Sequence, residues 1–256
     1  MQVVILAGGK GLRLPEETIE RPKPMVEIGP APILWHIMKI YGHYGFNDFI
    51  ICLGYKGYII KEYFLNYYYH LHNFTVDLKK GSISITRKQE PWKITLVDTG
   101  EHTETGGRLK RIQKYIKDKT FLMTYGDGLT DANINSIVDF HNKCGTSATV
   151  LAPNSPSKFG VLKTSDSSGI VIQFGEKISD SSYINGGFFV LNSKIFNNVV
   201  DDSTSWEYHS LPQLVQDQKL SAYKYDGFWK CMDSLKDKDE LCKMWDENKA
   251  PWKVWK

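Results

Sequence analysis

Short runs of consecutive apolar residues recur along the chain, and stretches with apolar residues every three to four positions lie between them. Runs of the first kind are typical of buried strands, and spacing of the second kind is typical of helices that cover a sheet. The expected strands are Val3–Leu6, Phe49–Leu53, Phe121–Thr124, Ala148–Leu151 and Gly187–Leu191. The expected helices are Ile33–Tyr44, Tyr58–Tyr69, Arg108–Ile116 and Ile134–Lys143. This alternation predicts an α/β fold with crossover helices.

Two segments depart from the alternation. Residues 74–100 hold short β-type runs around Lys80-Gly81 and a break at Glu90-Pro91-Trp92, which predicts a small β-rich hairpin insertion. Residues 206–256 have helical spacing around "DGFWKCMDSL" and end in an aromatic tail, which predicts a helical C-terminal part. Because the sequence has no internal repeat or charged linker, we expect one domain over residues 1–256.

The overall charge excludes some classes of protein. Lys and Arg number 32 against 29 Asp and Glu, a balance that excludes a nucleic-acid coat or a membrane-surface protein. No apolar run approaches the roughly 18 to 20 residues that cross a bilayer. The four cysteines have no CxxC spacing. We therefore expect a cytoplasmic protein with reduced thiols, in which any positive field is local.

The segment after the first apolar run carries the strongest chemical signal. Residues 3–28, "VVILAGGKGLRLPEETIERPKPMVEI", contain three closely spaced glycines and the cations Lys10, Arg13 and Lys23. A glycine-rich turn after a strand exposes backbone N–H groups that bind phosphate. The Walker pattern does not fit, and Leu14 stands where the dinucleotide pattern needs its third glycine. On these residues alone, an ordinary tight turn stays equally open.

Several motifs together give a resemblance. "LAGGKGLRL" followed by "RPKPMVEIG" resembles the N-terminal signature of the sugar nucleotidyltransferase (nucleoside-diphosphosugar pyrophosphorylase) family. Segments such as "TGGRLKRI", "FLMTYGDGL" and "GFWKCMDSLKDKDEL" are similar to its glucose-1-phosphate cytidylyltransferase branch, and the resemblance covers essentially the whole chain. It implies a Rossmann-like mixed sheet flanked by helices. The nucleotide would lie over the carboxyl ends of the strands, and the sugar in an adjoining β-rich pocket.

The implied reaction makes CDP-glucose and pyrophosphate from CTP and α-D-glucose 1-phosphate. A phosphate oxygen of the sugar attacks the α-phosphorus in line, so two anions must be held together by fixed cations and Mg²⁺. The resemblance assigns Arg13 to the β and γ phosphates and Lys23 to a bridge between the α-phosphate and the sugar phosphate. Pro22 and Pro24 stiffen the backbone that aims Lys23. Without the resemblance, a solvated loop lysine is the ordinary interpretation.

Two aspartates are the expected metal ligands. Asp127 follows the run Phe121–Thr124, and Asp233 precedes a helical segment. Their ordinary interpretations are a turn aspartate and a helix N-cap. The resemblance implies that this pair binds Mg²⁺, which takes one or two carboxylates together with phosphate oxygens and water. Asp131 ranks second, since it stands where the next helix begins.

The remaining expected contacts also follow from the resemblance. In "TETGGRLKR", Gly106 and Gly107 would let the backbone approach the pyrimidine, and Arg108 would donate to cytosine O2 and N3. A solvated basic first turn of a helix is the alternative. The expected nucleotide-binding residues are Leu6, Ala7, Gly8, Gly9, Gly11, Leu12, Arg13, Thr103, Gly107, Arg108 and Gly126. The expected sugar-phosphate-binding residues are Lys23, Glu176, Lys177 and Asn185.

Some positions depart from the family pattern. Leu12 stands where the family usually has threonine, so a hydroxyl that could bind phosphate or ribose is missing. Ile178 replaces a common proline, and Lys10 is an extra cation that we expect to be solvated. UTP or dTTP in place of CTP, another phosphorylated acceptor, and a non-catalytic regulatory homologue all stay open. Arg13, Lys23 and the two aspartates together favour an enzyme, and the resemblance suggests a homo-oligomer such as a trimer of dimers.

Overall fold

A seven-stranded sheet forms the centre of the fold in this computed structural model, which describes residues 1–85, 90–154, 160–165, 169–175 and 183–256. Its strand order is β14-β10-β13-β8-β1-β4-β7, and β13 runs antiparallel to both of its neighbours while the other pairs are parallel. The strands are β1 (Gln2–Leu6), β4 (Asp48–Leu53), β7 (Lys93–Asp98), β8 (Thr120–Tyr125), β10 (Ala148–Pro153), β13 (Phe188–Asn192) and β14 (Leu220–Tyr225). The predicted mixed α/β sheet is confirmed.

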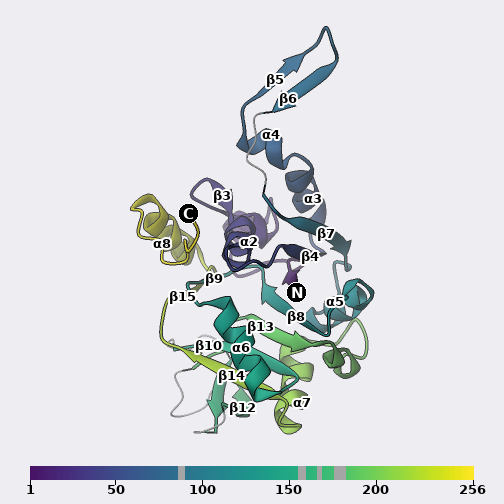
Figure 1. Ribbon diagram of the computed structural model, residues 1–256, viewed down its shortest axis with the longest axis vertical. Coiled ribbons are helices and arrows are strands. Elements are labelled where there is room, and N and C mark those ends of the chain that lie inside the picture. The colour runs from purple at the N-terminus through teal and green to yellow at the C-terminus, as the bar shows by residue number, and fades with distance from the viewer. Residues whose placement is uncertain (86–89, 155–159, 166–168, 176–182) are drawn as a thin grey trace.

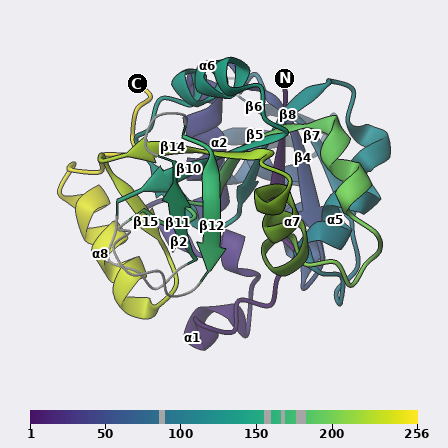
Figure 2. The same ribbon diagram turned by 90° about the horizontal axis from the view of Figure 1, so that it is seen from below.

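Helices cover both faces of this sheet. Alternate residues of β1 point to opposite faces, so that Val3 and Ile5 join one buried cluster and Val4 and Leu6 join the other. The first cluster includes α2 (Ile33–His43), α3 (Gly57–Leu65), α6 (Ile134–Cys144) and α8 (Leu235–Asp246). The second includes α5 (Thr105–Ile112) and α7 (Leu211–Gln216), and Figure 2 shows α8 and α5 on opposite sides of the molecule. Burial on both faces explains why the strands read as continuous apolar runs.

Shorter elements complete the described part of the chain. The helical segments are α1 (Pro15–Thr18), η1 (Lys23–Met25), α4 (Tyr67–Leu71), η2 (Gln113–Tyr115), η3 (Ser193–Asn198) and η4 (Trp206–Ser210). Four two-stranded sheets pair β2 (Glu27–Ile28) with β3 (Ala31–Pro32), β5 (Phe74–Asp77) with β6 (Ser82–Ile85), β9 (Gly128–Thr130) with β15 (Trp229–Cys231), and β11 (Val161–Thr164) with β12 (Val171–Gly175). Within the described residues, no helix is long and apolar enough to cross a membrane.

The predicted insertion is shorter than expected. The hairpin β5–β6 projects away from the sheet (Figure 1), but Lys93–Asp98 form β7, which pairs in parallel with β4 at the sheet edge. The prediction that the insertion extends to residue 100 is therefore wrong. Because β7 is an edge strand in which only Val97 is buried, it lacks the uninterrupted apolar run of the central strands.

The C-terminal part is also less helical than expected. Besides α7 and α8 it contains β14, which pairs with β10, and β15, which pairs with β9. The sequence of β14, "LSAYKY", mixes polar and apolar residues, and β15 has only three residues. Neither segment has the long apolar run on which the strand predictions depended. In addition, the single helix expected over Tyr58–Tyr69 is divided at Asn66 into α3 and α4.

The aromatic C-terminal tail packs against α2 around a buried histidine. His36 is fully buried, and its ring lies against those of Trp245 and Trp252. Its Nε2 lies 2.8 Å from the carbonyl oxygen of Ile28, and Trp252 Nε1 donates to its Nδ1 over 3.3 Å. Since Nδ1 accepts and Nε2 faces a carbonyl, the imidazole is neutral with its proton on Nε2. Burial lowers the pKa of His36 to about 4.

This histidine makes stability depend on pH. An unfolded histidine titrates near about 6.5, so the stabilisation from neutral His36 is present above that pH and is lost as the pH falls toward the folded pKa. We expect the free energy of unfolding to fall by about 2 kcal/mol from this group between about pH 7 and 5. The variant His36→Gln keeps a donor for the carbonyl of Ile28 but has no group that titrates in this range. Its free energy of unfolding, measured with urea at about pH 7 and 5, should therefore lack the fall that His36 causes. An equal pH dependence in the two proteins would contradict the assignment.

Candidate active site

A cleft of about 1150 Å³ lies at the carboxyl ends of the central strands. Leu6 pairs with Tyr125, so the loops that follow β1 and β8 leave the sheet side by side. The loop after β7 and residues 185–188 form other walls. In α/β sheets this edge is where ligands bind. The predicted site residues that line the cleft are Leu6, Ala7, Gly8, Gly9, Gly11, Leu12, Arg13, Lys23, Thr103, Arg108, Gly126, Asp127 and Asn185.

The glycine-rich loop needs its glycines for steric reasons. A Cβ on Gly8 would lie 2.1 Å from Nη1 of Arg108, and Gly11 has a φ of +65°, which disfavours other residues. Nothing lies within 4 Å of a Cβ placed on Gly9, so that position is open toward the cleft. The side chain of Leu12, which stands where the family usually has threonine, is 80% exposed. It therefore makes no buried contact that could replace the missing hydroxyl.

Arg108, on α5, differs from its expected role. It is 4% exposed, and Nη1 donates to the carbonyl of Leu53 (3.1 Å), Oγ1 of Thr99 (2.9 Å) and the carbonyl of Gly100 (2.7 Å). Nη2 donates to the carbonyls of Gly8 (3.1 Å) and Glu101 (3.3 Å). Both terminal nitrogens are thus bonded to protein acceptors rather than free for cytosine O2 and N3. In this arrangement Arg108 links the loops that follow β1 and β7 to the last residue of β4.

Gly107 also serves packing rather than the cleft. Its N–H donates to the carbonyl of Thr204 over 3.0 Å, and a Cβ there would lie 2.6 Å from the backbone of Asp202. Gly106 meets Thr204 in the same way. The two glycines let α5 approach the 202–204 segment closely, which differs from the expected approach to a pyrimidine. Thr103, by contrast, is on the cleft wall.

Four predicted residues meet at one end of the cleft. Lys23 Nζ lies 2.7 Å from Oδ2 of Asp127 and 2.6 Å from Oδ1 of Asp233. Arg13 Nη1 lies 2.6 Å from Oδ2 of Asp233. The β9–β15 ladder aligns the two aspartates, because Met232 donates its N–H to the carbonyl of Asp127 over 2.9 Å. Residues far apart in sequence thus form one charge cluster.

The charges of this cluster are coupled. Burial alone would lower the pKa of Lys23, but the carboxylates of Asp127 and Asp233 outweigh burial and raise it above the usual range. The lysine is therefore an ammonium held between two carboxylates. A position that stabilises this cation has the oxygen donors that a hard divalent ion prefers, so the aspartate pair fits a divalent metal ion.

Cys231 was missed by the sequence analysis. Its Sγ and one carboxylate oxygen from each of Asp127 and Asp233 all lie within 4.8 Å of one another. Burial, followed by the charge of Asp127, raises the pKa of the thiol well above its usual value. The available signal was its spacing: in extended backbone, residues 231 and 233 point to the same side.

The sugar-side expectations are only partly within the described residues. Asn185 lines the cleft, and its Oδ1 accepts from the N–H of Gly187 over 2.9 Å. Glu176, Lys177 and Ile178 lie outside the described residues. Glu207, which was not predicted, also lines the cleft and accepts from Tyr125 Oη at 2.5 Å and from Thr105 Oγ1 at 2.6 Å. Its position in η4 gave no sequence signal.

Asp131 is separate from the charge cluster. Its Oδ1 accepts from the N–H of Phe228 over 2.8 Å and from the hydroxyl of Tyr225. These bonds fix the turn that leads into β15. Lys10, the extra cation of the loop, lies 3.3 Å from Glu101, and both side chains are about half exposed.

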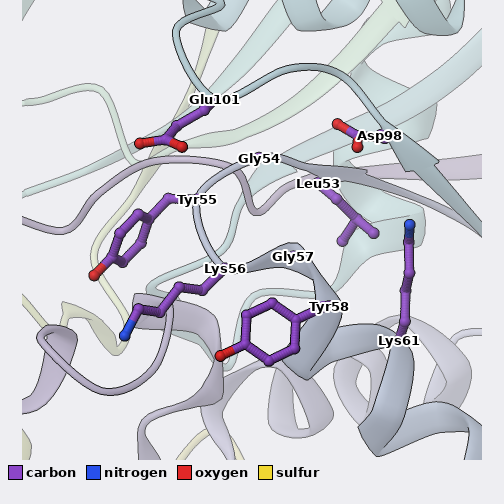
Figure 3. A pocket seen from close by; sticks show the side chains of 9 residues that line it. All are labelled: Leu53, Gly54, Tyr55, Lys56, Gly57, Tyr58, Lys61, Asp98 and Glu101. Atoms are coloured by element: carbon purple, nitrogen blue, oxygen red, sulfur yellow. The ribbon is translucent and has the colours of Figure 1, made fainter.

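A second pocket of about 420 Å³ lies beyond Gly54, between the start of α3 and the end of β7 (Figure 3). Glu101 lines both this pocket and the cleft. Tyr55 Oη donates to the carbonyl of Thr18 over 3.1 Å, and Lys56 Nζ donates to that of Glu20 over 3.3 Å. These bonds attach the segment after the glycine-rich loop to the start of α3.

Comparisons with known proteins show which proteins this chain is similar to. The nucleotidyl transferase family model matches residues 2–236. The chain is 51% identical to a glucose-1-phosphate cytidylyltransferase of Salmonella typhi over 258 residues, and 45% identical to a probable glucose-1-phosphate cytidylyltransferase of Bacillus subtilis (strain 168) over 256. Both alignments cover 100% of each chain.

Solved structures share the fold. HddC from Yersinia pseudotuberculosis superposes with a TM-score of 0.76 at 24% identity, covering 95% of this chain and 99% of that one. A UDP-glucose pyrophosphorylase complexed with UDP-glucose gives 0.74 at 15% identity, covering 96% and 98%. With a family model over nearly the whole length and relatives aligned from end to end, the chain belongs to the nucleotidyl transferase family.

Proposed function

We propose that this protein is a glucose-1-phosphate cytidylyltransferase, which makes CDP-glucose and pyrophosphate from CTP and α-D-glucose 1-phosphate. The cluster of Arg13, Lys23, Asp127 and Asp233 carries the proposal, because it brings two cations and two carboxylates together where the first three of these residues line the cleft. The full-length similarity to a Salmonella typhi enzyme of that name supports the choice of substrates.

Each residue has a defined task in this reaction. Backbone N–H groups of the glycine-rich loop and Arg13 bind the triphosphate, and Lys23 neutralises the two phosphates that react. Asp127 and Asp233 would hold a divalent ion, Mg²⁺ in our proposal, which supplies further positive charge to the triphosphate. The sugar phosphate is already an anionic nucleophile, so no protein base is needed. Asn185, Glu176 and Lys177 are proposed to bind the sugar phosphate.

We propose that the base is read by groups of the cleft wall near Thr103 rather than by Arg108. The five hydrogen bonds from Arg108 to protein acceptors support this change. Arg108→Met should then lower stability and the activity with every nucleotide, because several buried acceptors lose a charged donor at about 1 to 3 kcal/mol each. The ratio of kcat/KM for CTP over UTP should stay within about threefold of the wild-type ratio. A collapse of that ratio would return base reading to Arg108.

The decisive experiment is a matrix of four nucleoside triphosphates against several sugar 1-phosphates, read by pyrophosphate release. We expect CTP with glucose 1-phosphate to exceed every other pair by at least about tenfold in kcat/KM. The reason is that a wrong substrate leaves a buried polar group unpaired, at about 1 to 3 kcal/mol. Faster turnover with UTP or dTTP would change the nucleotide. Binding of sugar nucleotide without any turnover would favour a regulatory homologue.

We further propose that residues 1–256 act as one domain in the cytoplasm. We also propose that the chain forms a homo-oligomer. Phe74, Val76, Leu78 and Ile83 are exposed on and beside the projecting β5–β6 hairpin, and apolar groups gathered in this way favour a protein interface. Replacing Val76 and Ile83 by glutamate should reduce the sedimentation coefficient to that of a smaller species. An unchanged coefficient would remove the hairpin from the interface.

A further inference from the structure

The charge cluster contains a soft donor among hard ones. Asp127 and Asp233 offer carboxylate oxygens, and Cys231 offers a sulfur, with these ligand atoms all within 4.8 Å of one another. Metal–ligand bonds of about 2.0 to 2.3 Å would draw these three atoms to about 3 to 4 Å from one another. The three side chains would therefore move inward, and the ammonium of Lys23 would leave its place between the two carboxylates.

The backbone holds the sulfur in this place. Cys231 pairs with Gly128 in the β9–β15 ladder. Gly128 directly follows Asp127, and Cys231 stands two residues before Asp233. The sulfur therefore does not depend on a flexible loop for its position. Cys231 also lines the cleft, so an ion that enters with the substrates can reach it.

A second observation marks this point as a cation position. The ammonium of Lys23 already lies between Asp127 and Asp233, at 2.7 Å and 2.6 Å from their oxygens, and Lys23 is 7% exposed. It shows where these carboxylates stabilise positive charge. An ion that takes this position displaces the ammonium toward the cleft and meets the sulfur as a third ligand.

The chemistry of the donors separates two classes of ion. Mg²⁺ takes oxygen ligands in octahedral geometry and has little affinity for sulfur. Zn²⁺ and Co²⁺ bind thiolate, and three protein ligands with one open position is a usual zinc arrangement. We propose that Asp127, Cys231 and Asp233 together form a site for a thiophilic divalent cation such as Zn²⁺, overlapping the position of the proposed Mg²⁺ ion.

Two consequences follow. The thiol proton is released to solvent when the ion binds, since the thiolate is the ligand. Zn²⁺ then competes with Mg²⁺, and the thiolate takes a coordination position that would otherwise be available to a phosphate oxygen or water. The proposal deepens the metal site of the proposed function, but its ion selectivity is independent of which nucleotide or sugar the protein uses.

The test uses Co²⁺ as a spectroscopic probe on the full-length, metal-free protein without nucleotide or sugar. We expect one equivalent of Co²⁺ to produce a thiolate-to-cobalt charge-transfer band, which Zn²⁺ removes by displacement. Cys231→Ser and Cys231→Ala should lack the band and bind Zn²⁺ about tenfold or more weakly. Cys242→Ser is the matched control, since Cys242 is a partly exposed cysteine on α8 outside the cluster, and it should keep the band.

Mn²⁺ distinguishes loss of the sulfur from loss of the fold. Because Mn²⁺ prefers oxygen ligands, its affinity by electron paramagnetic resonance should change by less than about threefold in Cys231→Ser. Absence of the band in wild-type protein titrated with Co²⁺, or its persistence in both Cys231 variants, would overturn the proposal. Neither result depends on nucleotidyl transfer, so a failure of the substrate matrix and a failure of this site are separate outcomes.

Discussion

Lys23→Ala will lower the rate of nucleotidyl transfer by about a hundredfold or more, on the order of 3 kcal/mol in the barrier. The lysine is buried at the end of the cleft, and its ammonium is held charged by Asp127 and Asp233. In the proposed reaction this charge would lie beside both phosphates and would stabilise the transition state more than either substrate alone. The loss should therefore appear mainly in kcat, measured by pyrophosphate release at saturating substrates.

Three controls show whether the loss of rate is specific to Lys23, rather than due to a general loss of positive charge on the loop or to unfolding. Lys10→Ala removes a partly exposed cation of the same loop that pairs with Glu101, and it should retain most of the activity. Lys23→Met keeps the aliphatic stem and should behave as the alanine variant does. Both Lys23 variants remove the cation that Asp127 and Asp233 share, so Mg²⁺ should raise their melting temperature more than that of the wild type. A loss below about threefold in kcat/KM would remove Lys23 from the mechanism.

Asp127→Asn and Asp233→Asn will each reduce activity by about a hundredfold to a thousandfold, because an amide is a weaker ligand than a carboxylate for a divalent ion. CTP should still bind weakly through Arg13 and the glycine-rich loop. Added Mg²⁺ should restore only part of the rate, since the variant lacks ligand charge rather than metal in solution. The measurement is kcat against Mg²⁺ concentration, with CTP affinity from calorimetry.

The aspartate prediction also has a matched control. Asp118→Asn changes a partly exposed carboxylate near the amino terminus, where it lies 3.6 Å from the N-terminal amine, and it should leave the Mg²⁺ dependence unchanged. Exhaustive treatment of the wild type with EDTA should abolish turnover. Full rate after that treatment would mean that the two carboxylates serve only to position Lys23.

The strands that the sequence predicted correctly are those buried on both faces. β1, for example, has five buried residues in five positions, and such a run is recognisable without knowledge of its neighbours. β7 was assigned to the hairpin insertion and β14 was missed, because both lie at the edges of the sheet, where polar residues interrupt the apolar run. Pairing with a distant strand, which a local pattern does not contain, decides their structure.

The same limit applies to the site. Arg13 and Lys23 could be predicted because the motif resemblance includes the loop that carries them. The sequence also showed where Arg108 lies in its motif, but not which groups it contacts. Its donors are used by five protein acceptors, from the loops after β1 and β7 and from the last residue of β4. Whether an arginine is free for a ligand depends on carbonyl groups brought close by the fold. Cys231 and Glu207 became visible for the same reason only in three dimensions.

The β9–β15 ladder has a consequence for how the protein becomes functional during synthesis. It joins segments that are far apart in the sequence. At its end, the hydroxyl of Thr130 donates to the carbonyl of Phe228 over 2.8 Å, although the two residues are 98 positions apart. Contacts across so long a loop form late, since the closure entropy must be overcome before the pairing contributes. A nascent chain that ends before residue 229 can build the glycine-rich loop but cannot bring Asp233 to Asp127. We therefore expect ribosome-bound chains to be inactive until the segment that carries Asp233 has been synthesised and has paired with β9.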